Sequence, residues 1–502
     1  MAAILRDARS PEDVQPWHRI ASRICALGGL ALLGVFWGSA VAVADWNALY
    51  LCVSLLGCVF ILRDFRIGVV LLILLMPISR SDLFPHAMLG ITGLNPLNLL
   101  LVATLGSCLL HGLSDGSMRR LVPRPLLWLY IVPILIAGAL GSRHVGDIAP
   151  FYFMDGQLEF NSVAGYLREL ALKPLLMLVY ALLVGAAVSK AAEPEKFLVP
   201  ILISIWVMGS MVIVFVFLSG VTLSHMATQS ERNLLTTLVG LHANELGRLY
   251  LTAYALLLFT WAESKDRGLK LALLASKGLV VVALMITFSR SAFVGFIVVN
   301  ALFLLWRRNA KTLIFAGLLA AVALLLLPAA VYDRVTTGFG DGLNAITAGR
   351  TGSIWLPLLP EVLRSPIYGN GLGSILWSET MRRADGVAIL PVGHPHSAYL
   401  EAALDIGIAG LIIVCAYFAH VWKGFRALSV DPALSPTLRG FYLGAAAGLA
   451  SLLIADIADG SLRPGSEQAF LWLAIGMMYG QRGHNTGDSS VSRQYAQAGT
   501  HT

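Results

Sequence analysis

Hydrophobic positions are grouped in long runs along the chain, and short polar segments separate them. Apolar runs near twenty residues predict helices that can cross a bilayer core of ~30 Å. Fourteen such runs predict an all-α, polytopic integral membrane protein. They cover residues 24–44, 47–62, 67–79, 96–112, 126–141, 168–188, 197–219, 248–263, 269–289, 291–306, 312–331, 398–421, 440–456 and 466–480.

The composition supports the same class. Of the 502 residues, 57% are hydrophobic and only 13% are charged, and the mean hydropathy is +0.75. Soluble domains carry about 25% charged residues, so this chain has too few charges to cover a water-soluble globule. Disordered, coiled-coil, collagen-like and disulfide-rich secreted proteins are excluded as well. The five cysteines all lie in apolar runs without a CxxC spacing, which excludes a disulfide framework and a zinc site of that type.

The net charge of +7 is explained by membrane topology rather than by nucleic acid. With the N-terminus in the cytoplasm and fourteen crossings, 22 of the 36 basic residues fall in cytoplasmic segments, 12 on the opposite side and 2 within spans. Basic residues concentrate in cytoplasmic loops, so this orientation is favoured. The 12 basic residues on the far side have no such explanation, and they become candidates for function.

This topology predicts five regions. The end of the first run, Ala42-Val43-Ala44, resembles a signal-peptidase site, but the run is long and favours an uncleaved anchor. The regions are a cytoplasmic segment (1–23), helices one to eleven (24–331), an outer loop (332–397), helices twelve to fourteen (398–481) and a disordered cytoplasmic tail (482–502).

The outer loop between the eleventh and twelfth helices is the longest polar segment, with about 65 residues, and loops of this length are usually functional. We expect it to contain a short helix over 353–363. The chain has no Walker-type phosphate loop, no HExxH pair and no GxSxG elbow.

The strongest local pattern lies where this loop meets the twelfth helix. Gly393-His394-Pro395-His396-Ser397 is followed by Gly407 and Gly410. Eleven residues make about three helical turns, so the spacing predicts that His396 and Gly407 share a helix face. Glycines at such positions allow a neighbouring helix to approach closely. An imidazole would then stand at the outer end of a tightly packed helix.

These residues resemble the H[NSQ]x9GxxG signature of the O-antigen ligase and O-antigen polymerase superfamily. Thr287-Phe288-Ser289-Arg290 is similar to the family's Ser-Arg motif, and Gly349-Arg350-Thr351 resembles the start of its run towards the histidine. The resemblance is closest across 285–415.

The resemblance implies a GT-C-like membrane fold of about 12–14 helices and a glycosyltransferase in the bacterial inner membrane, with its active site facing the periplasm. The donor would be a glycan on undecaprenyl pyrophosphate. The acceptor would be lipid A-core for a ligase, or a second lipid-linked glycan for an O-antigen or exopolysaccharide polymerase. It implies no cofactor and no nucleic-acid partner, and the remaining partners are membrane lipids.

The reaction makes two chemical demands that these residues fit. The leaving pyrophosphate needs positive charge, and arginine can fork onto phosphate oxygens where no DxD pair holds a metal. Arg290 and Arg350 are therefore the predicted pyrophosphate-binding residues. The attacking hydroxyl must lose a proton, and His396 is the predicted general base because the pKa of histidine lies near neutrality. We expect a metal-independent single displacement with inversion at the anomeric carbon.

Further polar residues have weaker assignments. Arg168 would contact the donor headgroup or pair with Glu169, and Asp456 and Asp459 would be functional or pair with Arg463. His394 stands two residues from His396, but the intervening proline and the absence of a third ligand argue against a metal. His242 and Asn244 lie in the second outer loop, where they would reach a sugar.

A transporter or flippase of lipid-linked sugars is the alternative from another class. It predicts polar residues on broken helices at mid-membrane. In this chain the polar residues concentrate outside the predicted spans instead.

Overall fold

The fold is described from a computed structural model of the chain. It describes residues 46–81, 85–88, 91–114, 122–154, 160–221, 239–308, 329–381 and 392–482, with isolated residues between these ranges. Nearly all of this part of the chain is helical, and its strands are a two-residue hairpin, β1 (Ala87–Met88) with β2 (Ile91–Thr92). The predicted all-α architecture is confirmed.

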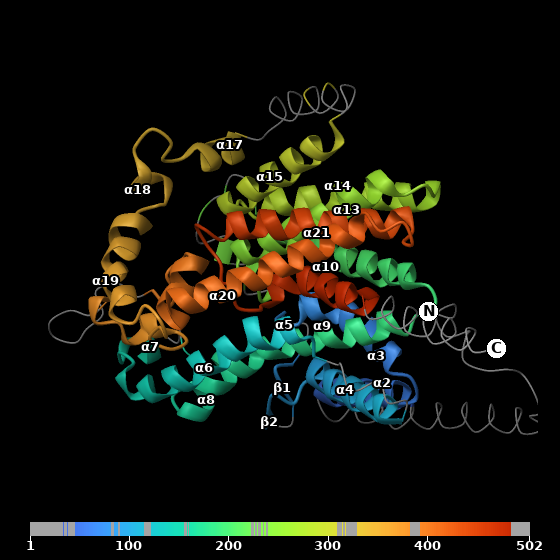
Figure 1. Ribbon diagram of the computed structural model, residues 1–502, viewed down its shortest axis with the longest axis horizontal. Coiled ribbons are helices and arrows are strands. Elements are labelled where there is room, and N and C mark those ends of the chain that lie inside the picture. The colour runs from blue at the N-terminus through green and yellow to red at the C-terminus, as the bar shows by residue number, and fades with distance from the viewer. Residues whose placement is uncertain are drawn as a thin grey trace, which may run out of the picture.

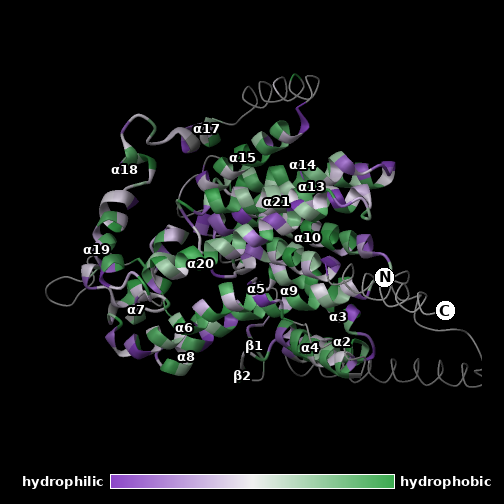
Figure 2. Cartoon of the chain, viewed as in Figure 1, coloured by the Kyte–Doolittle hydropathy of each residue, from purple (hydrophilic) through white to green (hydrophobic). Residues whose placement is uncertain are grey.

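The helices lie side by side along the long axis of the molecule (Figure 1). Hydrophobic positions cover most of their length (Figure 2). The long helices of the first half are α2 (Trp46–Arg63), α3 (Phe65–Leu75), α4 (Pro96–Ser114), α6 (Val132–Gly141), α9 (Lys173–Ser189) and α10 (Leu198–Ser219). Those of the second half are α13 (Ala243–Glu263), α14 (Arg267–Ile286), α15 (Arg290–Arg307), α20 (Ala398–Ser429), α21 (Pro436–Ala455) and a last helix over 469–482.

Shorter elements connect these helices. They are η2 (Met76–Ile78), α5 (Arg124–Leu126), η5 (Ser142–Asp147), α7 (Phe151–Met154), α8 (Val163–Leu167), η7 (Pro194–Phe197), α17 (Ala329–Thr336), α18 (Leu343–Ile346), α19 (Leu356–Arg364), η9 (Ser374–Trp377), η10 (Glu379–Met381) and η11 (Ser466–Gln468). The predicted short helix over 353–363 corresponds to α19 and the turn before it.

Three helices contain a widened π-type turn, and each of these turns ends immediately before the turn that carries a proline. The turns are η4 (Leu127–Ile131), η6 (Arg168–Leu172) and η8 (Thr351–Trp355), which precede Pro133, Pro174 and Pro357. Proline has no N–H and its ring clashes with the carbonyl four residues earlier, so the helix widens locally. Two of these turns, η6 and η8, adjoin residues of the candidate site described below.

The centre of the bundle is the contact between α13 and α21. A Cβ atom on Gly440 or Gly444 would come within 2.6 Å of a carbonyl oxygen of α13, at Phe259 and Ala255 respectively. The two backbones can approach this closely because these positions of α21 have no side chain. α13 is almost entirely buried as a result.

The predicted spans can be compared with these helices. Twelve of the fourteen fall within the described residues, and a helix occupies each of them. Eight of the described helices are long and apolar enough to cross a membrane, and two more apolar helices, Leu49–Arg63 and Phe65–Ile78, are shorter. The last two are α13 and the helix over 469–482, which pack inside the bundle. The predicted spans 24–44 and 312–331, the segment 1–23 and nearly all of the tail 482–502 lie outside the described residues.

The close contact of α13 and α21 predicts the effect of enlarging Gly444. Gly444→Val places a side chain against the Ala255 carbonyl, so we expect the free energy of unfolding to fall by about 1–3 kcal/mol through overpacking. Thermal unfolding of the detergent-solubilised protein measures this.

Gly106→Val is the matched control, because a Cβ atom on Gly106 of α4 meets nothing within 4 Å. Equal losses of stability in the two variants would contradict the proposed contact.

Candidate active site

A cavity of about 880 Å³ lies at one end of the bundle, where α13, α15 and α20 begin and α21 ends. Arg290, Arg350 and His396, predicted from separate motifs, all line it. Loops from the long segment before α20 and from residues 458–467 complete its wall. The structure therefore brings the three predicted residues together in one space.

His396 lies just outside helix α20 rather than on it. The side chain of Ser397 caps the helix by accepting a hydrogen bond from the Leu400 N–H, and His396 has a left-handed backbone with φ of +53°. The indole N–H of Trp355 donates to the Pro395 carbonyl at 2.9 Å, which anchors the turn from the neighbouring segment. The prediction that His396 and Gly407 share one helix face is wrong, because the helix begins after the histidine.

Gly407 interrupts α20, with φ of +75° and ψ of 170°. The loop after α19 enters the break: the Gly371 N–H donates to the Asp405 carbonyl at 3.0 Å, and the Ile408 N–H donates to the Pro366 carbonyl at 2.7 Å. A Cβ atom on Gly407 would lie 2.6 Å from the Ile367 carbonyl oxygen. The glycine of the signature thus allows a close approach, but its partner is this loop and not a neighbouring helix.

Gly410 has a different neighbour again. A Cβ atom there would meet the side chain of Ile406 at 2.8 Å, across the break in the same helix. Both glycines of the signature therefore serve the local shape of α20. The expectation that they pack a neighbouring helix is wrong, because the bend brings other backbone and side-chain atoms against them.

His396 has a carboxylate partner that the sequence did not reveal. Its Nδ1 lies 3.4 Å from an Asp459 carboxylate oxygen, an arrangement that places the proton on Nδ1 and leaves Nε2 free to accept one. Burial alone would raise the pKa of the Asp459 carboxyl. The hydrogen bond with His396 and the charges of Arg248 and Arg350 outweigh burial and hold this pKa well below its ordinary value. Asp459 is therefore an anion next to the imidazole.

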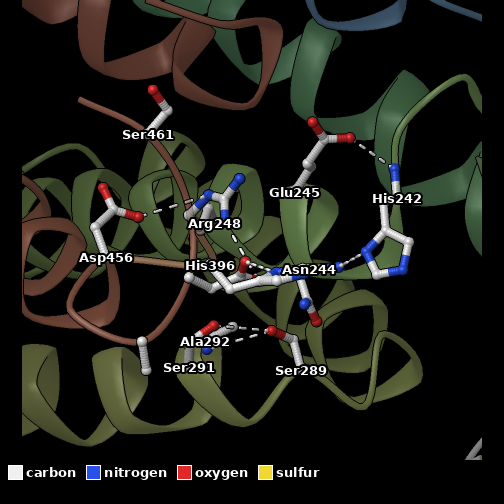
Figure 3. Close-up of polar contacts among 12 residues, drawn as sticks. His242, Asn244, Glu245, Arg248, Ser289, Ser291, Ala292, His396, Asp456 and Ser461 are labelled. Carbon is white, nitrogen blue, oxygen red and sulfur yellow. Dashed lines mark hydrogen bonds and ion pairs between the residues drawn. The ribbon is translucent and has the colours of Figure 1, made fainter. Parts of the chain in front are cut away.

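Arg248, which is buried on α13, faces the acidic residues at this end of α21. It lies 3.6 Å from Asp459 and 3.7 Å from Asp456, and Figure 3 shows the contact with Asp456. The alternative that Arg463 pairs with these aspartates is wrong, since Arg463 forms a close ion pair with Glu401 of α20. Asp456 also accepts the Ala398 N–H on its backbone carbonyl at 3.0 Å, which ties the start of α20 to the end of α21.

Four further guanidinium groups line the cavity, and none of them forms a salt bridge with a carboxylate of the described residues. Arg290 donates to the Thr337 carbonyl at 3.2 Å and Arg350 to the Ala458 carbonyl at 2.5 Å. Arg232 is buried and donates to the Asn244 side chain at 2.5 Å. Arg334 of α17 has a buried Nε without a hydrogen-bond partner.

The electrostatics of these four arginines indicate an anion site. Burial, together with the neighbouring guanidinium groups, lowers the pKa of Arg232 to about 10. Burial and the same neighbours also lower the pKa values of Arg334 and Arg350. Like charges held together in this way repel one another, and a bound anion relieves that repulsion.

Sequence reasoning missed Arg232, Arg248 and Arg334 as site residues. The available signal was their place among the basic residues on the far side of the membrane, where the positive-inside rule does not explain them. That rule gave no reason to choose these three arginines over the other arginines on the far side.

Two helices begin at the cavity wall. α15 starts at Arg290 after the cap Ser289, and α13 starts after the cap His242 (Figure 3). The His242 imidazole accepts the Asn244 N–H, and its burial beside Arg232 lowers its pKa to about 4, so it is neutral near pH 7. The Glu245 carboxylate already accepts the His242 N–H at the start of α13. α15 has no acidic residue in its first turn, and the N-terminus of a helix favours negative charge, so α15 adds to the anion site.

His394 faces His396, with ring centroids 3.9 Å apart. Its side chain is exposed in the cavity, and desolvation by the surrounding protein together with the neighbouring His396 lowers its pKa to about 4, so it is neutral near pH 7. Its Nδ1 accepts the backbone N–H of His396 at 3.2 Å. The neutral ring therefore carries its proton on Nε2.

A metal ion has a candidate donor set here. Ligand atoms of His394, His396 and Asp459 lie within 4.8 Å of one another, so the third ligand that the sequence lacked is supplied by Asp459. However, the hydrogen bonds of His394 Nδ1 and His396 Nδ1 use two of the donor atoms, and Arg248 lies beside the aspartate. The residues fit proton transfer better than they fit a divalent cation.

Arg168 is not part of the cavity wall, whereas its neighbour Glu169 is. The Arg168 Nε donates to the Glu169 carboxylate at 2.9 Å, so the ion-pair interpretation of Arg168 holds. His242 and Asn244, expected to reach a sugar, do line the cavity.

Comparison with known proteins gives one family. The family model described as O-antigen ligase matches residues 275–415, a segment that includes Arg290, Arg350, His396 and both glycines of the signature. No curated protein matches the chain. Asp459 and Arg248, which contact the core of the site, lie outside the matched segment.

The arginine cluster predicts binding of a simple anion. Arg290→Gln or Arg350→Gln removes one of the converging charges, so the affinity for inorganic pyrophosphate should fall at least about tenfold, the loss expected for one charge-assisted contact. Isothermal titration of the detergent-solubilised protein measures the affinity.

Arg364→Gln is the control, because Arg364 lies outside the cavity and pairs with Glu379. Unchanged affinity in both cavity variants would rule out the anion site.

Proposed function

We propose that this protein, whose residues 275–415 match the family model described as O-antigen ligase, is a membrane-embedded glycosyltransferase that moves a glycan from undecaprenyl pyrophosphate to an acceptor hydroxyl. The acceptor proposed is the sugar of lipid A-core, as in a ligase. The site would face the periplasm at the inner membrane, an orientation supported by the basic residues of the opposite loops.

The observation that carries this proposal is the position of His396 between two kinds of charge. On one side its Nδ1 faces the Asp459 carboxylate, and the cavity that it lines also holds Arg232, Arg290 and Arg350. A base next to an anion site is what transfer from a pyrophosphate donor requires.

The chemical step follows from this arrangement. The acceptor hydroxyl oxygen attacks the anomeric carbon while His396 Nε2 takes its proton. The bond between the anomeric carbon and the phosphate oxygen breaks, and the electron pair leaves with the pyrophosphate. A single displacement of this kind inverts the anomeric configuration.

Asp459 would act through His396. Its carboxylate holds the Nδ1–H, which orients the ring and stabilises the imidazolium formed when Nε2 takes a proton. Because Arg248 holds Asp459 in turn, the dyad is fixed before substrate binds.

The arginines and the N-terminus of α15 would bind the pyrophosphate. The negative charge that develops on the leaving oxygen would meet guanidinium groups already in place, which lowers the barrier without reorganisation. Arginine thereby supplies the charge that a metal supplies in other glycosyltransferases, and we propose a metal-independent reaction.

The break in α20 gives no support to a flippase. It lies near the site end of the helix, and the loop after α19 fills it with backbone hydrogen bonds. Transporters place such breaks at mid-membrane, where they bind their cargo.

Substitution of the base tests the proposal. In a strain that lacks the gene, His396→Gln should abolish long surface polysaccharide, since loss of a general base costs roughly 10²–10⁴-fold in rate. Gel analysis of the polysaccharide and immunoblotting of the membranes measure product and insertion.

His144→Gln is the control, because His144 lies outside the cavity and pairs with Asp147. Normal polysaccharide with His396→Gln would remove the catalytic role.

Glycolipids of the null strain identify the acceptor. Loss of a ligase leaves long chains on undecaprenyl pyrophosphate and bare lipid A-core, whereas loss of a polymerase leaves single repeat units.

Asp459 gives a graded test of the dyad. Asp459→Asn should lower kcat more than it changes the KM of either substrate, because the amide no longer orients the imidazole or stabilises its charge. Asp459→Glu should restore part of kcat. Steady-state kinetics of the purified enzyme would contradict the positioning role if only KM changed.

A further inference from the structure

The segment between the cavity and the break in α20 carries an exposed apolar face that the reaction does not use. α19 buries Leu358, Glu361 and Val362 against the protein. Its opposite side exposes Leu356, Leu359 and Leu363, at the i, i+3 and i+7 spacing of one helix face. Ile367 and Tyr368, just after the helix, are also exposed.

The polar side of α19 packs against the protein and forms hydrogen bonds there. The Glu361 carboxylate accepts the Ser378 hydroxyl at 2.5 Å and the Thr380 N–H at 2.7 Å. α19 therefore has Glu361 inward and its leucines outward, and Arg364 at its end is exposed and pairs with Glu379. A helix that faced water on this side would expose its charged side chains and bury its leucines.

The apolar face continues directly onto a membrane span. The Pro366 carbonyl accepts the Ile408 N–H, so the end of the segment is joined to α20 at the break. From that point α20 exposes Ile408 and, one turn on, Ile412. α20 is one of the helices apolar enough to cross the bilayer, so these isoleucines face lipid.

The part of α20 after the break places this junction at the edge of the bilayer core. Residues 408–429 form a continuous helix of 22 residues, about 33 Å at 1.5 Å per residue, which is enough to cross a core of ~30 Å. Lys423 and Arg426 mark the end where the helix leaves the lipid. Counting about 20 residues back from Lys423 reaches Leu404, so the core ends near Gly407 and His396 lies beyond it.

We propose that residues 356–368, the in-plane segment, lie in the headgroup region of the bilayer with Leu356, Leu359 and Leu363 inserted into its acyl boundary. Figure 1 shows α19 running across the end of the bundle, whereas α20 and α21 run along its long axis. The flanking Tyr368 and Arg364 are the residue types that occupy this interface. This inference does not depend on the proposed reaction.

The in-plane segment would set the depth of the cavity. The turn that precedes α19 carries Trp355, whose N–H holds the Pro395 carbonyl next to His396. A helix seated on the bilayer surface therefore fixes the imidazole at the height of lipid headgroups.

Site-directed spin labelling tests the depth. The five native cysteines are replaced, and single cysteines are introduced as Leu356→Cys, Leu359→Cys and Leu363→Cys in the full chain. Each protein is reconstituted into phosphatidylethanolamine–phosphatidylglycerol vesicles. The controls are Ile412→Cys on the lipid-facing side of α20 and the exposed Asp341→Cys in the loop before α18.

We expect labels on the three leucines to collide more with oxygen than with a water-soluble nickel chelate, as the Ile412 label does, and the Asp341 label to show the reverse. Three positions keep the test valid if one variant does not fold. Two or more leucine labels resembling the Asp341 label would overturn the proposal. Labels immobilised and shielded from both reagents would overturn it too, because a second copy or another protein would then cover the face.

Discussion

The backbone hydrogen bonds across the break in α20 are the constraint on which the candidate site depends. A helix interrupted at Gly407 leaves carbonyl and N–H groups without partners, and in or near lipid such groups are costly. The loop 365–371 satisfies them from outside the helix. The loop follows α19 directly, and Trp355 just before α19 anchors the histidine turn through the Pro395 carbonyl. The site geometry therefore depends on the hydrogen bonds that this loop supplies to the interrupted helix.

The charges of the cavity have two distinct arrangements. The acidic side chains of Asp456 and Asp459 are buried around Arg248. Arg232, Arg290 and Arg350 instead donate to carbonyl or amide oxygens and retain their positive field. In the proposed reaction the first set would hold the base in position and the second would bind the anion. The proton and the leaving group would then move towards different groups of the cavity.

The membrane supplies the third element of this organisation. In the proposed arrangement the part of α20 after Gly407 crosses the bilayer core, so the turns before it and His396 would extend beyond the lipid. A substrate with a lipid tail and a charged headgroup would then meet apolar helix surface and arginine side chains at matching depths. α19, which runs across the bundle, adds an apolar surface at the same level (Figure 1).

The sequence by itself determined the class of fold, the helices within the described residues and several cavity residues, among them Arg290, Arg350 and His396. Hydropathy is a local property, and the signature lies in contiguous motifs, so both can be read without a structure. It did not determine the partner of Asp459, the roles of Arg232, Arg248 and Arg334, or the function of Gly407. Those depend on which distant segments meet. Arg248 reaches Asp456 because α13 packs against α21, and α20 is interrupted at Gly407 where the loop after α19 enters the helix. Side-chain pairing across a bundle is decided by packing, and packing is a property of the tertiary structure.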